Sequence, residues 1–169
     1  MKAKIIALIL ILFPILTSSC YVSNVKTYLH TVYWLKGNIF IVSSINSGNE
    51  LYINDLCNNL NQRLINSGYE SYSYVSDNMN SKFIAQQIES KKPKYILYIY
   101  PQDNFKKLSN GFVMTIYSLE LYSKDIAKKD TLIYRGSIKI SCRYDKKKEI
   151  VELASKKIIN AVFSEYRRK

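Results

Sequence analysis

The sequence predicts an α/β (α+β) domain with a single mixed sheet of about five strands and helices packed on the sheet. Three observations lead to this prediction. Apolar residues recur at helical spacing in three segments, short runs of strand type lie between them, and one six-residue run is apolar on both faces. In chain order these segments read β-α-β-α-β-β-β-α, and no internal repeat or low-complexity linker divides them. We therefore expect one domain over residues 37–169.

The first half of this domain alternates strands and helices. Residues 38–42 form a short apolar run of strand type. From residue 50 onward the apolar residues fall on one helical face, and Gly68 stands where a helix C-terminal glycine belongs. The apolar positions of this helix are Ile53, Leu56, Cys57, Leu60 and Leu64. Residues 69–75 alternate tyrosine with small polar residues, which predicts a second strand.

A second helix and a central strand follow. The spacing of Phe83, Ile84, Gln87 and Ile88 along one side suggests the helix, which is predicted to end before Pro93. Residues 95–100 are apolar on both faces. Such a run is typical of a strand that is covered on both sides of the sheet.

Two antiparallel strands and a last helix complete the domain. The hairpin signal Asn110-Gly111 precedes a strand predicted over residues 112–122, and a second strand is predicted over residues 131–142. In that second strand Ile138, Ile140 and Cys142 share one face, while Lys139, Ser141 and Arg143 share the other. The final helix is predicted over residues 146–166, with a buried stripe of Ile150, Ala154, Ile158, Ala161 and Val162.

The first 19 residues have the layout of a secretory signal peptide. Lys2 and Lys4 supply a positive start, a 12-residue apolar run follows, and small residues lead to Cys20. A helix that crosses a bilayer needs about 20 apolar residues, and Pro14 lies inside this shorter run. We therefore expect residues 1–19 to be a signal peptide and not a membrane-spanning helix.

Residues 16–20, Leu-Thr-Ser-Ser-Cys, resemble a bacterial lipobox. The resemblance implies that the Cys20 thiol receives a diacylglyceryl group and that Cys20 becomes the mature N-terminus. Thr17 stands where the family prefers leucine. Residues 20–36 are then the lipidated N-terminus and a tether. Tyr21, and not the aspartate of many inner-membrane lipoproteins, follows the cysteine, so the resemblance favours the outer membrane, facing the periplasm. The alternative is an ordinary signal peptide cut after Ser19, which leaves an unlipidated periplasmic protein.

A second resemblance concerns the domain itself. The pattern Leu119-Glu120-Leu121-Tyr122, a polar turn and Leu132-Ile133-Tyr134-Arg135-Gly136 resembles small periplasmic lipoprotein domains. This group includes the TolB N-terminal-like domains, the outer-membrane lipoproteins that activate penicillin-binding proteins and the CsgG-like lipoproteins. Since its members are binding and assembly modules, the resemblance implies a protein that is not an enzyme.

The residue inventory offers little catalytic chemistry. The 13 acidic residues are dispersed, there are five glycines, and neither a G-x-S-x-G motif nor a phosphate-binding glycine loop occurs. His30 is the single histidine and has no partner nearby in sequence, so we expect neither a metal site nor a cofactor. The net charge of +12 is spread along the chain without aromatic interleaving, so we expect no nucleic acid as a partner.

Cys57 and Cys142 are the cysteines that remain once Cys20 is lipidated. Both are predicted to face the core. In an oxidising compartment they could form a disulfide, and as buried residues they could equally be free thiols. The sequence leaves both alternatives open.

These observations predict a membrane-anchored periplasmic lipoprotein that binds another envelope component, with an envelope protein as the expected partner. Two other classes of function compete with it. One is a hydrolase of the cell wall or its polymers, and the other is a structural or immunity-type lipoprotein.

Overall fold

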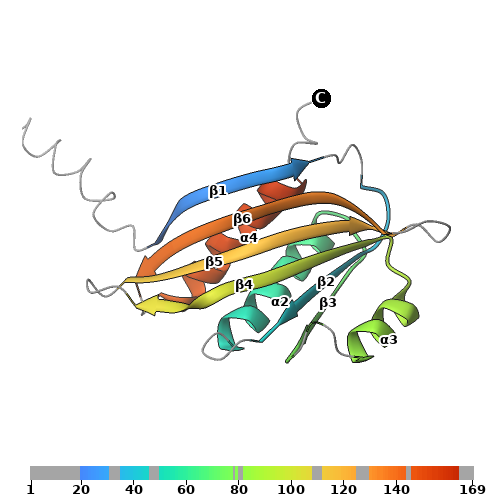
Figure 1. The fold of residues 1–169 in the computed structure, drawn as a ribbon, viewed down its shortest axis with the longest axis horizontal. Coiled ribbons are helices and arrows are strands. Elements are labelled where there is room, and N and C mark those ends of the chain that lie inside the picture. The colour runs from blue at the N-terminus through green and yellow to red at the C-terminus, as the bar shows by residue number, and fades with distance from the viewer. Residues whose placement is uncertain are drawn as a thin grey trace, which may run out of the picture.

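One open mixed sheet and three helices make up the part of the chain that the computed structural model describes, which is residues 20–30, 35–45, 50–77, 79, 82–107, 112–124, 130–143 and 146–163 (Figure 1). The strands are β1 (Cys20–His30), β2 (Ile39–Ser44), β3 (Ser71–Ser76), β4 (Tyr95–Lys107), β5 (Phe112–Ser123) and β6 (Thr131–Arg143). The helices are α2 (Glu50–Asn66), α3 (Lys82–Lys91) and α4 (Lys147–Phe163). The predicted signal peptide lies outside the described residues.

The strand order across the sheet is β1-β6-β5-β4-β2-β3. β2 pairs in parallel with β3 and β4, and the other neighbours pair antiparallel. From β2 onward the chain follows the predicted order β-α-β-α-β-β-β-α, which confirms the mixed α/β class. The parallel strands β2, β3 and β4 are connected through α2 and α3, as parallel pairing requires, whereas β4, β5 and β6 follow one another in the chain and pair antiparallel.

The prediction of about five strands was wrong, because the sheet has six described strands. The additional strand is β1, which occupies the segment expected to be a tether and pairs with β6. Its alternation is interrupted twice, between Val22 and Asn24 and between Thr27 and Leu29, where the register shifts. Such irregularities break the two-residue period by which a strand is recognised in a sequence.

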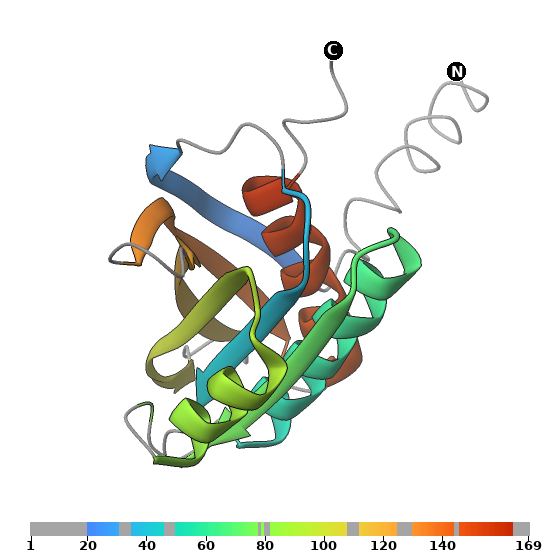
Figure 2. The ribbon, with the colours of Figure 1, turned by 90° about the vertical axis from the view of Figure 1, so that its right-hand side faces the viewer.

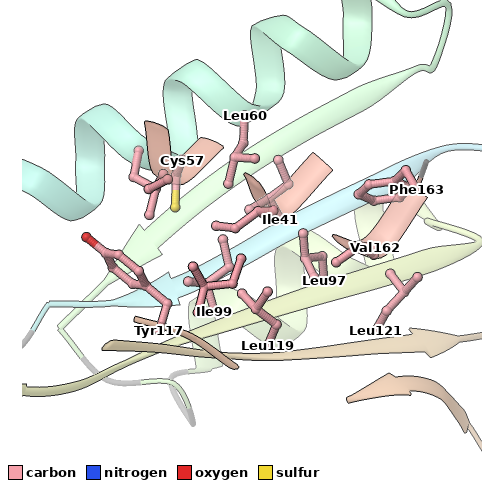
Figure 3. Close-up of a cluster of buried hydrophobic side chains, with 14 of the residues drawn as sticks. Ile41, Cys57, Leu60, Leu97, Ile99, Tyr117, Leu119, Leu121, Val162 and Phe163 are labelled. Carbon is pink, nitrogen blue, oxygen red and sulfur yellow. The ribbon is translucent and has the colours of Figure 1, made fainter. Parts of the chain in front are cut away.

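The main core lies on one face of the sheet, under α2 and α4 (Figures 2 and 3). The helices contribute the expected stripes, including Leu60 from α2 and Ile158 from α4, both fully buried. The inward-facing residues of the strands are Ile39, Ile41, Tyr95, Leu97, Ile99, Tyr117, Leu119, Leu121, Tyr134, Ile138 and Ile140. The predicted faces of residues 138–142 are therefore confirmed for the apolar set.

The opposite face carries a smaller core under α3. Ile84 of α3 packs with Phe40, Val42 and Ile96. Because Ile96 faces α3 while Leu97 faces α2 and α4, β4 is covered on both sides, as predicted. Phe83 was expected on the apolar face of this helix but is 66% exposed. Since α3 is a short helix that covers a few residues of β2 and β4, only its one inward position is buried.

The end of α2 follows the sequence signal closely. Gly68 adopts a φ of 87°, its N–H donates to the Ile65 carbonyl, and the Tyr69 N–H donates to the Leu64 carbonyl at 3.0 Å. These bonds satisfy the last carbonyls of the helix. The described helices include none that is long and apolar enough to cross a membrane.

Candidate functional site

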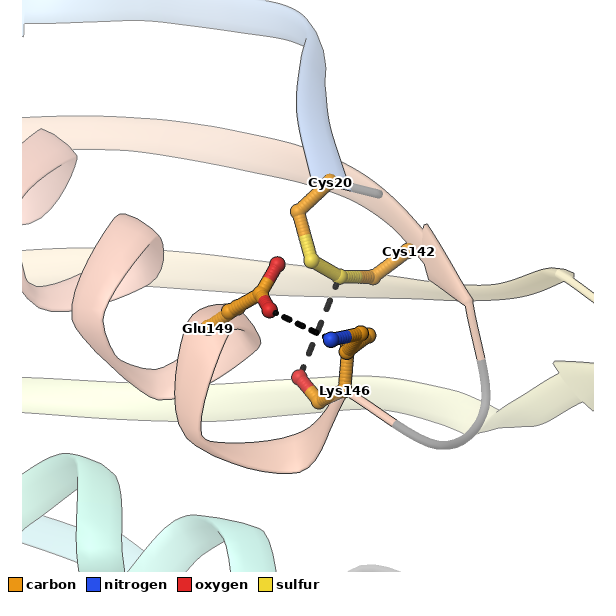
Figure 4. Close-up of a disulfide and its surroundings, with 4 residues drawn as sticks. All are labelled: Cys20, Cys142, Lys146 and Glu149. Carbon is orange, nitrogen blue, oxygen red and sulfur yellow. Dashed lines mark hydrogen bonds and ion pairs between the residues drawn. A yellow bond between two sulfur atoms is a disulfide. The ribbon is translucent and has the colours of Figure 1, made fainter. Parts of the chain in front are cut away.

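The predicted lipidation site, Cys20, is the first residue of β1 and lies at one end of the sheet (Figure 1). Its register partner on β6 is Cys142, and their Cα atoms are 4.1 Å apart. The two sulfurs form a disulfide (Figure 4). Cys20 is partly buried against a small cluster of Val113, Cys142 and Ile150. The residue expected to begin a tether is thus fixed in the sheet.

The turn from β6 into α4 lies next to the disulfide. The Lys146 N–H donates to the Arg143 carbonyl at 3.0 Å, and the Lys146 carbonyl oxygen lies 4.0 Å from the Cys142 sulfur. The Lys146 ammonium forms an ion pair with Glu149 at 3.1 Å (Figure 4). This turn therefore brings the backbone of Lys146 close to the Cys20–Cys142 disulfide.

Cys142 pairs with Cys20 and not with Cys57. The disulfide between Cys57 and Cys142, one of the two alternatives that the sequence allowed, is therefore not formed. Cys57 is a free, buried thiol in α2. Sequence reasoning reserved Cys20 for the lipid and so did not consider it as a disulfide partner. The signal that identifies this pair is the antiparallel register of β1 and β6, which the sequence does not show.

The environment of Cys57 makes its thiol unreactive. Burial raises the pKa of Cys57 to about 12, and a hydrogen bond with Ser43 lowers it by less. The Ser43 hydroxyl donates to the Ile99 carbonyl at 2.7 Å. Because the thiolate is the nucleophilic form, a cysteine with this pKa is protonated at neutral pH.

The face of β4, β5 and β6 that α2 and α4 do not cover is polar and aromatic. Tyr98 lies against the rings of Tyr100 and Tyr122, with centroids 6.1 and 5.7 Å away. Arg135 of β6 and Glu120 of β5 form an ion pair at 2.9 Å. Burial raises the pKa of Tyr100 to about 12, and the nearby Glu120 carboxylate adds to the shift. We call this surface the open face of the sheet.

The described residues contain no group of three or more histidine, cysteine or acidic side chains that could hold a metal ion. His30 ends β1, and its side chain lies outside the described part of the structure.

The architecture of the described residues defines the class of protein as a mixed α/β domain, with one sheet that carries two helices on one face and one on the other. No protein-family model matches the chain, and no curated protein sequence matches it. Among solved structures, the PelC dodecamer from Paraburkholderia phytofirmans matches with a TM-score of 0.53 and 9% sequence identity. That match covers 82% of this chain and 96% of PelC. At this identity the likeness shows a shared fold.

The lipoprotein GNA1162 from Neisseria meningitidis matches with a TM-score of 0.40 and 12% identity, over 74% of this chain and 99% of GNA1162.

Proposed function

We propose that the chain is a bacterial envelope lipoprotein, anchored through a lipid on Cys20, whose domain is a non-catalytic binding or assembly module. One observation carries the proposal. The lipobox-like residues 16–20 end at Cys20, which is also the first residue of β1, so cleavage before this residue leaves every described strand in place. The sequence pattern favours the outer membrane, facing the periplasm.

The non-catalytic part of the proposal rests on the chemistry of the domain. Cys57, the free thiol among the described residues, is buried with a pKa of about 12. The open face of the sheet instead presents tyrosines and the Glu120–Arg135 ion pair. Aromatic rings and arginine are enriched where proteins bind one another. An envelope protein is therefore the partner we propose.

The mass of the mature N-terminal peptide tests the anchor. Purification of the protein from envelopes of its host, followed by mass spectrometry, should give Cys20 with a diacylglyceryl thioether, and Cys20→Ala should abolish both the modification and membrane retention. An unmodified Cys20 in the envelope protein overturns the proposal. Capture of one stoichiometric partner from envelope extracts supports the binding role, whereas turnover of wall fragments by the purified protein favours a hydrolase.

The proximity of Cys20 and Cys142 favours a second candidate, an exported protein without a lipid. One sulfur cannot form both a thioether and a disulfide. In this candidate the Cys20–Cys142 bond closes a loop with a sequence separation of 122 residues and ties β1 to the sheet. The same mass spectrum decides between the two, because here the peptides of Cys20 and Cys142 stay joined until a reductant is added.

A further inference from the structure

The proposed anchor site lies directly at the edge of the folded domain, because Cys20 is the first residue of β1. Across the sheet, Lys107, Val113, Cys142 and Cys20 follow one another in a single row of register partners. Cys20 itself belongs to this row, and one extended residue spans at most about 3.6 Å. A lipid on Cys20 therefore holds the row close to the membrane surface. The end of the sheet that contains the row then faces the headgroups.

Two aromatic side chains lie at this end of the sheet. Tyr21 is 51% exposed, and its ring lies 6.4 Å from the ring of Phe112. Phe112 begins β5 and pairs with Arg143, one position beyond the row of Cys20. Aromatic rings with one apolar and one polar edge are enriched at the level of lipid headgroups. The Tyr21 ring with its hydroxyl is suited to such a contact, and the Phe112 ring adds apolar surface beside it.

Basic residues complete the surface. Arg143 and Lys148 are exposed, and Lys146 is half-exposed at the start of α4. The connection over residues 143–149 contains four basic and two acidic residues. Four basic and two acidic residues give this segment a net charge of 4 − 2 = +2, and one of the acidic residues, Glu149, forms the ion pair with Lys146. Such a charge attracts anionic lipid within about one Debye length.

We infer that the Cys20 end of the sheet, with Tyr21, Phe112, Arg143, Lys146 and Lys148, docks on anionic phospholipid headgroups and so fixes how the domain stands on the membrane. This inference rests on the proposed lipid anchor. With this end on the membrane, the strands rise from the surface, and β6, with its 13 residues, extends about 40 Å from it. The far end and the open face of the sheet remain accessible to a partner.

The far end of the sheet offers a matched control. Lys91, Lys92 and Lys94 are exposed residues at the end of α3 and before β4. Tyr95, which follows them, pairs with Ser123 at the opposite end of β5 from Val113. The two sets of residues therefore carry equal formal charge and lie at opposite ends of the sheet relative to Cys20.

The experiment uses the mature chain with Cys20→Ser, so that binding does not depend on a lipid. Vesicles of phosphatidylcholine with and without phosphatidylglycerol are mixed with this protein at low ionic strength, and bound protein is measured by flotation. We expect binding to the vesicles that contain phosphatidylglycerol, and a loss of that binding as salt rises. The triple variant Arg143→Glu, Lys146→Glu, Lys148→Glu should bind at least tenfold more weakly, since each basic residue strengthens binding roughly fivefold.

The control variant Lys91→Glu, Lys92→Glu, Lys94→Glu should bind within about twofold of the parent. Thermal unfolding midpoints establish that both variants are folded. For the aromatic part, Tyr21→Ser should weaken binding more than Tyr28→Ser, which changes a tyrosine on the same strand that is 65% exposed. The inference is overturned if the parent does not prefer phosphatidylglycerol vesicles, or if the control lysines matter as much as the residues near Cys20. An unmodified Cys20 in cells would instead overturn the anchor, and it leaves the vesicle result unchanged.

Discussion

The two faces of the sheet are built from the same strands but are stabilised in different ways. On the face under α2 and α4, β5 buries Val113, Thr115, Tyr117, Leu119 and Leu121 at every second position. The intervening residues of β5 are half-buried and include Ser118, Glu120 and Tyr122. One face is therefore held by apolar packing between layers, and the other presents polar groups and ring edges over β5 and β6. The face under α2 and α4 depends on the exclusion of water, and the open face does not. Substitutions on the two faces should therefore change the free energy of unfolding by very different amounts.

Truncation of a core side chain should have the largest effect. Leu60 and Ile140 are fully buried on opposite sides of the helix–sheet interface. Their replacement by alanine removes apolar contacts and leaves a cavity, so each of Leu60→Ala and Ile140→Ala should lower the free energy of unfolding by about 2–5 kcal/mol. Denaturant unfolding measures this change.

Lys139→Ala is the matched control, because Lys139 is the neighbour of Ile140 on the opposite face of β6 and is half-buried. Lys139→Ala should lower the free energy of unfolding by less than about 1 kcal/mol. A cost for Lys139→Ala above that of Ile140→Ala would mean that the open face is covered by another layer.

Alkaline pH should weaken the covered face through Tyr117. Burial raises the pKa of Tyr117 to about 12 from an ordinary value of 10.0, although a hydrogen bond with Thr115 lowers it in part. Below pH 10 the tyrosine is neutral in both folded and unfolded chains. Between pH 10 and 12 the unfolded chain releases this proton and the folded one does not, so stability is lost as pH rises, by about 2–3 kcal/mol in total.

The test is the pH dependence of unfolding in Tyr117→Phe, which removes the ionisable group and keeps the ring. This variant should lose markedly less stability between pH 10 and 12 than the parent. Equal losses in the two proteins would show that the Tyr117 hydroxyl is accessible to water, and hence that the core of this face is not closed there.

A methyl group added to Gly136 should separate β1 from the sheet. A Cβ at this position would lie 2.7 Å from the Lys26 carbonyl of β1 and would also contact the Tyr134 hydroxyl. The backbone of β1 must move to accept it, and overpacking of this kind costs about 1–3 kcal/mol. We expect Gly136→Ala to speed hydrogen exchange in β1 more than in β5.

Ser137→Ala is the control for Gly136→Ala, since Ser137 is the next residue on β6 and lies on the other face of the strand. It should leave hydrogen exchange in β1 close to that of the parent. If Gly136→Ala and Ser137→Ala had equal effects, the close contact at Gly136 would not be what holds β1.

The contrast between the faces also explains what the sequence could predict. The stripes of α2 and α4 were found from spacing, because residues such as Leu56 and Ala154 face a continuous core and repeat with the helical period. β1 was missed, because its pairing depends on the free edge of β6 and its own period is broken at two bulges. The Cys20–Cys142 pair was missed for the same reason, since a register between residues 122 positions apart is a property of the folded sheet.

The smallest effect should come from the ion pair on the open face. Arg135 and Glu120 are register partners, with a shortest distance of 2.9 Å between Nη2 and Oε1, and their side chains are 52% and 20% exposed. Water screens such a pair, so a double-mutant cycle with Glu120→Gln and Arg135→Gln should give a coupling of about 0.2–1 kcal/mol that falls further with salt. The Tyr122 hydroxyl donates to Glu120 Oε2 at 3.1 Å, and burial together with this bond raises the pKa of Tyr122. Glu120→Gln should therefore also shift the spectroscopic titration of Tyr122 to lower pH. A coupling above about 2 kcal/mol, insensitive to salt, would place the pair in a medium of low dielectric constant. The open face would then be a buried interface, and the difference between the two faces would vanish.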